Sequence, residues 1–150
     1  MTKKVRLSES ALHQLMQGGF VHMDMSDWRE IPYSITNSVS YSRATADAVF
    51  HMISDLYRLE EEKVASYTIK IFDMGCGIGR HAFYFLQHLN ELLAKARYHD
   101  VNLSYVLFDI SATNIDFCKE HPKLQSYFSS GQLEVVCGSH TKLLSMLKEL

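Results

Sequence analysis

The sequence lacks an excess of charge of either sign, and it lacks any long apolar run. Its 150 residues hold 15 Lys and Arg against 17 Asp and Glu, so no long-range electrostatic field would attract nucleic acid or an anionic membrane. No stretch approaches the ~20 apolar residues that cross a bilayer, and the basic N-terminus is not followed by the apolar core of a secretory signal. We therefore expect a soluble protein with neither a strong nucleic-acid partner nor a membrane partner.

Cysteine is scarce and widely spaced. Cys76, Cys118 and Cys137 are odd in number and form no C-x-x-C pair, and the eight histidines form no H-x-x-x-H pair. A disulfide framework and a zinc site are therefore both disfavoured. The same usage favours a reducing compartment, so we expect a cytoplasmic protein without a bound metal.

A length of 150 residues suits one domain with a single core. Beyond residue 66, short β-branched and aromatic runs alternate with segments of helical apolar spacing. This alternation is typical of parallel strands joined by right-handed crossovers, so the sequence predicts an α/β fold with a three-layer open parallel sheet. The strands are expected at 67–73, 103–109 and 133–137, and the helices at 80–96, 113–120 and 141–150.

The N-terminal third is expected to supply helices and a connector. A short helix is predicted after the cap residue Ser8, and a second over 43–62. Residues 20–42 between them show no regular period, but their Trp and Tyr residues argue against disorder. Within this connector the Tyr33–Tyr41 loop is either a lid over a ligand or a packed linker, and both interpretations stay open. We expect residues 1–42 to form an N-terminal helix and capping loop, and residues 43–150 to form a ligand-binding domain.

The residues with the clearest chemistry follow the first predicted strand. Asp73 ends that strand, and Gly75, Gly77 and Gly79 alternate behind it in a D-x-G-x-G-x-G pattern. Glycines at a strand-to-helix turn allow tight backbone angles and close approach of a ligand. A dinucleotide fingerprint would need glycine where Arg80 stands, and the acid would repel a pyrophosphate. The pattern therefore favours a cationic ligand that carries no phosphate.

Two further residues of this segment, Cys76 and His81, are given structural interpretations. Cys76 is expected to be a tolerated small residue and not a nucleophile, because no base is positioned beside it. His81 is expected to be a solvated residue in the first turn of the helix, and the alternative is that it contacts a ligand. Neither is expected to take part in chemistry.

Polar residues also follow the second and third predicted strands. Asp109 ends the second strand, where an acid can accept hydrogen bonds from both ribose hydroxyls; the alternative is a cap on the following helix. Gly138 and Ser139 follow the third strand, where they would either contact an adenine ring or cap the next helix. Because ligands of open parallel sheets bind at the carboxyl ends of the strands, we expect one site at this edge.

Together these motifs resemble those of class I (Rossmann-like) S-adenosylmethionine-dependent methyltransferases. The segment 73–79 is similar to the first motif of that family, and the D-I-S triplet at 109–111 is similar to the second. Gly-Ser at 138–139 stands where the family often has Gly-Asp, so an adenine contact there would lack charge assistance. The likeness spans about residues 69–150, and it implies a Rossmann-like domain that binds S-adenosyl-L-methionine.

The resemblance also implies roles for individual residues. Asp73, Gly75 and Gly77 would line the methionine end of the cofactor, and Asp109 and Ile110 would meet its ribose and adenine. Members of the family often use an N-terminal segment as a lid over the cofactor, and Thr36, Asn37, Ser38 and Tyr41 would suit that role. The cofactor-binding residues implied in this way are Tyr41, Asp73, Gly75, Cys76, Gly77, Gly79, Asp109, Ile110, Gly138 and Ser139.

The sequence also lacks elements that the family has. The family's sheet has seven strands, and the end of its fourth strand supplies most catalytic or substrate-orienting residues; no candidate for that element is visible here. We therefore expect the N-terminal, cofactor-binding part of a longer methyltransferase in preference to a naturally reduced version. We expect no turnover by this chain alone, and neither the methyl acceptor nor a catalytic residue is identified.

The short sheet has a consequence for the oligomeric state, and two alternatives to a methyltransferase remain. The missing strand would flank the first one, so the first strand would be an exposed edge, and we expect the chain to self-associate through it. The alternatives to a methyltransferase are a non-catalytic S-adenosylmethionine-binding or interaction module, and an NAD- or nucleotide-dependent enzyme. Titration with the corresponding cofactors separates the last of these from the others.

Overall fold

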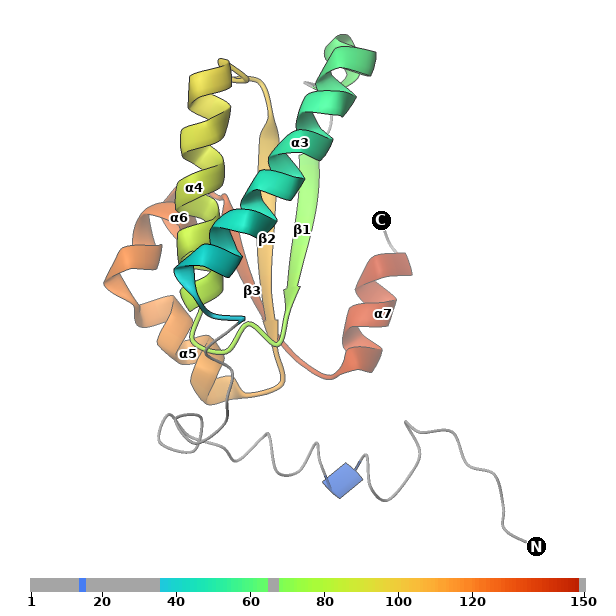
Figure 1. Ribbon diagram of the computed structural model, residues 1–150. Helices are drawn as coiled ribbons and strands as arrows, with labels where there is room; N and C mark the ends of the chain where they lie inside the picture. The colour runs from blue at the N-terminus through green and yellow to red at the C-terminus, as the bar shows by residue number, and fades with distance from the viewer. Residues whose placement is uncertain (1–13, 16–35, 65–67, 149–150) are drawn as a thin grey trace, which may run out of the picture.

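The computed structural model describes residues 14–15, 36–64 and 68–148 (Figure 1). From residue 68 onward strands alternate with helices, as the sequence predicts. The elements in chain order are α3 (Val39–Val64), β1 (Thr68–Met74), α4 (Arg80–Ala96), β2 (Asn102–Asp109), α5 (Ala112–Glu120), η2 (Pro122–Leu124), α6 (Gln125–Ser129), β3 (Leu133–Cys137) and α7 (His140–Lys148).

The three strands form one open parallel sheet in the order β1-β2-β3. In its register Ile71 pairs with Tyr105, and Tyr105 pairs with Leu133. Parallel neighbours need helical crossovers because the chain must return to the same end of the sheet before the next strand begins. The α/β class and the open parallel sheet predicted from the sequence are therefore confirmed.

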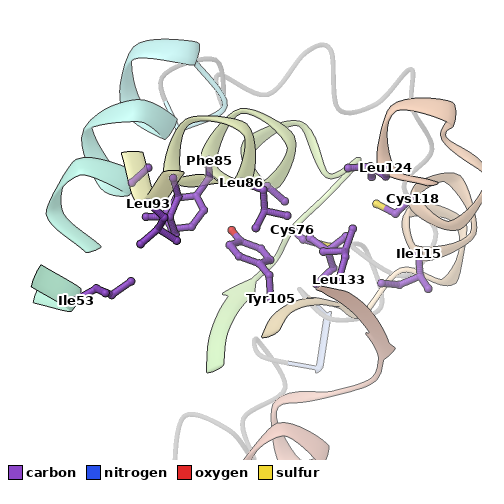
Figure 2. Close-up of a cluster of buried hydrophobic side chains, with 14 residues drawn as sticks. Ile53, Cys76, Phe85, Leu86, Leu93, Tyr105, Ile115, Cys118, Leu124 and Leu133 are labelled. Carbon is purple, nitrogen blue, oxygen red and sulfur yellow. The ribbon is translucent and has the colours of Figure 1, made fainter. Parts of the chain in front are cut away.

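One face of the sheet carries the main core (Figure 2). Tyr105 of the central strand contacts Phe85 of α4, with ring centroids 5.2 Å apart, and Leu86 and Ile115 are buried in the same cluster. Burying one such aliphatic side chain contributes roughly 1.5–3 kcal/mol through removal of apolar surface from water. Figure 1 shows α4, α5 and α6 on this side of the sheet and α7 on the other.

Two polar contacts fix α4 between its neighbours. His88 Nε2 lies 2.8 Å from Asp47 Oδ1 and joins α4 to α3. Asn90 and Gln132 exchange two amide hydrogen bonds of 2.9 Å and join α4 to the residue before β3. Because α4 follows β1 after a short turn, these contacts also hold the turn in place.

Helix α4 and strand β3 have the bounds that the sequence predicts, but the start of α3 differs. This helix begins at Val39 instead of residue 43, so the last residues of the predicted connector are helical and the boundary at 42/43 falls inside a helix. The short helices η2 and α6 are not predicted; Pro122 occupies the first position of a 3-10 turn, where its fixed φ is favourable. The remainder of the predicted helix after Ser8, beyond the helical residues 14–15, lies outside the described residues, as does most of the connector.

Strand β1 lies at one edge of the sheet that the described residues form. The backbone groups on its outer side therefore have no strand partner within that sheet. Met74 at its carboxyl end is 64% exposed. An edge of this kind is a template for pairing with another chain, which is the arrangement that self-association would require.

Candidate functional site

The turn between β1 and α4 is a loop of alternating glycines that folds over the end of β2. The backbone N–H groups of Gly75 and Cys76 both donate to the carbonyl of Phe108, at 2.8 and 3.2 Å. Gly75, Gly77 and Gly79 have φ values of 75°, 54° and 73°, in the left-handed region that side chains disfavour. The backbone path itself therefore explains the glycines at these positions.

The three glycines differ in what surrounds them. A Cβ at Gly79 would lie 3.0 Å from Leu124 Cδ1 and 3.1 Å from Cys118 Sγ, so Gly79 permits close packing of the loop on the core. A Cβ at Gly75 or Gly77 would meet nothing within 4 Å. The absence of side chains there leaves open space beside the loop.

That space belongs to a cavity of about 330 Å³ at the carboxyl end of β1. It falls in the ~300–1,000 Å³ range of small-molecule sites. Four of its lining residues are in the predicted set, namely Tyr41, Asp73, Gly75 and Gly77. Thr36 and Asn37, two of the residues expected to suit a lid, also line it, and the lining residues that the prediction missed are Met74, Ile78, His81 and Asn114.

Asp73 is half-buried and lines this cavity. Its Oδ2 accepts a hydrogen bond from the Tyr105 hydroxyl at 3.1 Å, and its Oδ1 has no hydrogen-bond partner among the described residues. Burial raises the pKa of the Asp73 carboxyl above its usual range; the nearby His81 and the Tyr105 bond oppose this, and Asp109 adds to it. A carboxylate that is costly to keep charged is stabilised when a cation lies beside it.

His81 also lines the cavity, and its expected role as a solvated residue is wrong. It is half-buried, its Nδ1 lies 3.0 Å from the Ser42 hydroxyl, and its ring stands 5.6 Å from the ring of Tyr41. Ser42 and Tyr41 lie in the first turn of α3, where the sequence predicts the end of the connector. The contact was missed because no local pattern links residues 41–42 to the start of α4.

Asp109 does not line the cavity; it is buried behind the glycine loop. Its Oδ2 accepts the backbone N–H of Gly77 at 2.9 Å and lies 3.5 Å from Asn114 Nδ2. Its Oδ1 accepts the backbone N–H of Ser111 at 2.8 Å. The carboxylate thus ties the loop after β1 to the start of α5, and its role toward a ribose stays a prediction.

The other predicted residues lie around this centre without lining the cavity. Cys76 is buried in the core, and Ile110 is half-buried at the end of β2. Gly138 donates its N–H to the Asp109 carbonyl at 3.0 Å, and the carbonyl of Ser139 accepts N–H groups of the first turn of α7. Ser139 therefore stands at the start of α7, and its contact with an adenine ring stays a prediction.

We expect Cys137 to react with iodoacetamide in the folded protein while Cys76 and Cys118 stay unmodified. Cys137 is exposed, whereas the other two are buried. Hydrogen bonding of the protonated Cys76 thiol with Cys118, together with burial, raises the pKa of Cys76 far above its usual range and maintains the unreactive form. Mass spectrometry of native and denatured samples measures the difference. Equal labelling of Cys76 and Cys137 in the native sample would contradict this arrangement.

Comparisons of the chain with protein-family models, curated proteins and solved structures found no match. Among the described helices none is long and apolar enough to cross a membrane. Within the same part of the chain, no group of three or more His, Cys, Asp or Glu residues could hold a metal ion. A functional proposal therefore has to come from the cavity and the motifs around it.

Proposed function

We propose that the cavity binds S-adenosyl-L-methionine and that the chain is the cofactor-binding part of a Rossmann-like methyltransferase. The observation that supports this most strongly is the pairing of open space at Gly75 and Gly77 with a half-buried carboxylate at Asp73. The glycines give a ligand access to the backbone, and the acid determines the charge of the group that can sit there.

The charge of Asp73 supports this cofactor over a dinucleotide. Burial already makes the ionised carboxylate unfavourable, and a pyrophosphate beside it would add repulsion between like charges. S-adenosyl-L-methionine carries an ammonium and a sulfonium and no phosphate. A cation next to Asp73 would relieve the cost of the buried charge.

The remaining residues of the cavity fit the same ligand. The Asp73 Oδ1 atom is available to accept from the ammonium of the methionine moiety. His81 stands in the first turn of α4, where the ring and the free N–H groups of the helix suit a carboxylate. Tyr41 would cover the ligand from α3. Asp109 does not line the cavity, so its part in the site would be to hold the N–H of Gly77, and a ribose contact stays a prediction.

When bound, the cofactor would supply an electrophilic methyl group for in-line transfer to a nucleophilic acceptor. The residues of the cavity bind and orient it, and positioning is the main contribution that such a reaction needs. The acceptor and the residue that would deprotonate it are not assigned to any side chain of this site.

Calorimetric titration of the chain tests the proposal directly. S-adenosyl-L-methionine and S-adenosylhomocysteine are expected to bind at least about tenfold more tightly than NADH, a difference of about 1.4 kcal/mol. NADH binding of equal or greater strength would favour the dinucleotide alternative and end the proposal.

A matched pair of glycine variants separates ligand contact from backbone strain. Gly75 and Gly131 have φ values of 75° and 74°, and a Cβ at either would meet nothing within 4 Å, but only Gly75 lines the cavity. Gly75→Ala and Gly131→Ala should each destabilise the fold by about 1–2 kcal/mol. Only Gly75→Ala should weaken S-adenosylhomocysteine binding, by about tenfold. Equal affinity in the two variants would remove Gly75 from the site.

We also propose that the free edge of β1 pairs with the same strand of a second copy. The strand is apolar along much of its length and forms the sheet edge in the described part of the chain. Light scattering over a concentration series should show a dimer that dissociates on dilution. Proline is tolerated at the first residue of a strand, so Thr68→Pro should fold and weaken the dimer. A monomer at every concentration would rule this interface out.

A further inference from the structure

A second hollow of about 210 Å³ lies beside the cavity, between α4 and the segment that follows α5. Ile78 of the glycine loop lines both spaces and forms the wall between them. Nothing in the proposed cofactor site uses the residues on its far side. This second hollow is therefore a separate feature of the surface.

The second hollow has an aromatic and aliphatic lining. Phe83 and Tyr84 come from the first turns of α4, Phe117 comes from α5, and Leu124 ends η2. The rings of Phe83 and Tyr84 lie 5.1 Å apart in an edge-to-face arrangement, which holds both in place. Rings from two different helices that line one small space suit a planar group.

Two cations stand at the same hollow, and each lies over a ring. The Arg80 guanidinium lies 5.7 Å from the centroid of Tyr84, and the Lys123 ammonium lies 5.3 Å from the centroid of Phe83. Neither forms an ion pair with another described residue, and no Asp or Glu is among the described residues that line the hollow. The rings position the charges without neutralising them.

His121 adds a third donor. Its Nδ1 accepts the backbone N–H of Lys123 at 3.3 Å, so the ring proton lies on Nε2, which is then a hydrogen-bond donor. The ring is also held against Phe117, with centroids 5.4 Å apart. The hollow therefore gathers a guanidinium, an ammonium and an imidazole N–H.

We propose that this second hollow binds a small aryl phosphate, with its ring against Phe83 and Phe117 and its phosphate among Arg80, His121 and Lys123. A phosphate monoester has three terminal oxygens and up to two negative charges, which match three donors of which two are cationic. A carboxylate has only two oxygens and one negative charge, so it would leave one of the three donors without an acceptor. The volume lies below the usual range of drug-sized sites, so it suits one ring and its anion and not a dinucleotide.

Titration of the full chain without any methionine-derived cofactor tests this site independently of the proposed function. The probes are phenyl phosphate, inorganic phosphate and benzoate, followed by calorimetry or by amide chemical shifts. Phenyl phosphate should bind about tenfold more tightly than either of the others, because each lacks one of the two recognised groups. Equal affinity for phenyl phosphate and inorganic phosphate would overturn the role of the rings and with it the proposal.

Two double variants of equal charge change separate a local site from a general attraction to anions. Arg80→Gln with Lys123→Gln removes both cations of the hollow, whereas Lys95→Gln with Lys119→Gln removes two exposed cations that do not line it. The first pair should weaken phenyl phosphate binding by about tenfold, and the second should leave it unchanged. Thermal unfolding confirms that both are folded. Equal losses in the two double variants would mean that no specific phosphate site exists.

Discussion

Replacing Asp73 by Asn is expected to remove most of the affinity for S-adenosyl-L-methionine and, at neutral pH, to make the ligand-free protein more stable. Asn keeps an acceptor for the Tyr105 hydroxyl, which lies 3.1 Å from Asp73 Oδ2. It loses the charge that would pair with the ammonium of the ligand. A charge-assisted hydrogen bond is worth about 1.5–3 kcal/mol, so the affinity should fall by roughly ten- to a hundredfold.

The gain in stability follows from the direction of the pKa shift. Burial raises the pKa of Asp73 in the folded protein, so this group favours the fold at acidic pH, where it is protonated in both states. That contribution is lost as the pH rises through the raised pKa, because the buried carboxylate must then carry its charge. Asn stays neutral at every pH, so its advantage should appear at neutral pH and vanish near about pH 4.

Thermal unfolding at both pH values, together with calorimetry, measures the two effects in one variant. Asp100→Asn is a suitable control because that side chain is exposed and does not line the cavity. The affinity of the wild-type chain should also rise with pH through the acidic range, while that of Asp73→Asn should stay flat. A variant that is less stable at neutral pH and binds as well as the wild type would show that Asp73 is a structural residue only.

The sheet and its helices could be predicted because the signal for them is local. Helix α4 repeats apolar residues at helical spacing directly after the glycine loop, so its extent follows from neighbouring residues. The same holds for β3, a short apolar run after a Gly-containing turn. The glycine loop was equally visible, because its D-x-G-x-G-x-G spacing requires a strand-to-helix turn.

The contacts that assemble the site could not be predicted, because they join residues far apart in sequence. Ser42 meets His81 across 39 positions, and Gly77 meets Asp109 across 32. No periodicity reports such pairs. The start of α3 was also missed, since its first turn is rich in Ser and Tyr and reads as a loop. Asn114 is not predicted as a cavity residue either, because the turn into α5 brings it next to Asp109 and no local pattern indicates this.

Replacing Asp109 by Ala is expected to have the largest effect on stability. The carboxylate is buried and accepts the backbone N–H groups of Gly77 and Ser111 at 2.9 and 2.8 Å. The Ser111 N–H is buried and the Gly77 N–H is partly buried, so leaving both without an acceptor costs up to about 1–3 kcal/mol each, a large part of the ~5–15 kcal/mol of a typical domain. Chemical denaturation should therefore show a loss of roughly 2–6 kcal/mol. Asp116→Ala, an exposed acid on the adjoining helix α5, should cost well under about 1 kcal/mol.

A second variant, Asp109→Asn, distinguishes two ways in which Asp109 could contribute to ligand binding. If it binds the ribose, Asp109→Asn should reduce affinity for S-adenosylhomocysteine more than for an analogue without the 2′-hydroxyl, and the two ligands should then bind about equally. If it acts only by holding Gly77, both affinities should fall by the same factor, because the loop moves for either ligand. Calorimetry of both ligands on both proteins completes the cycle. Since Asp109 is only 5% exposed and its oxygens already accept two backbone N–H groups, a ribose contact would have to add to these bonds without replacing them.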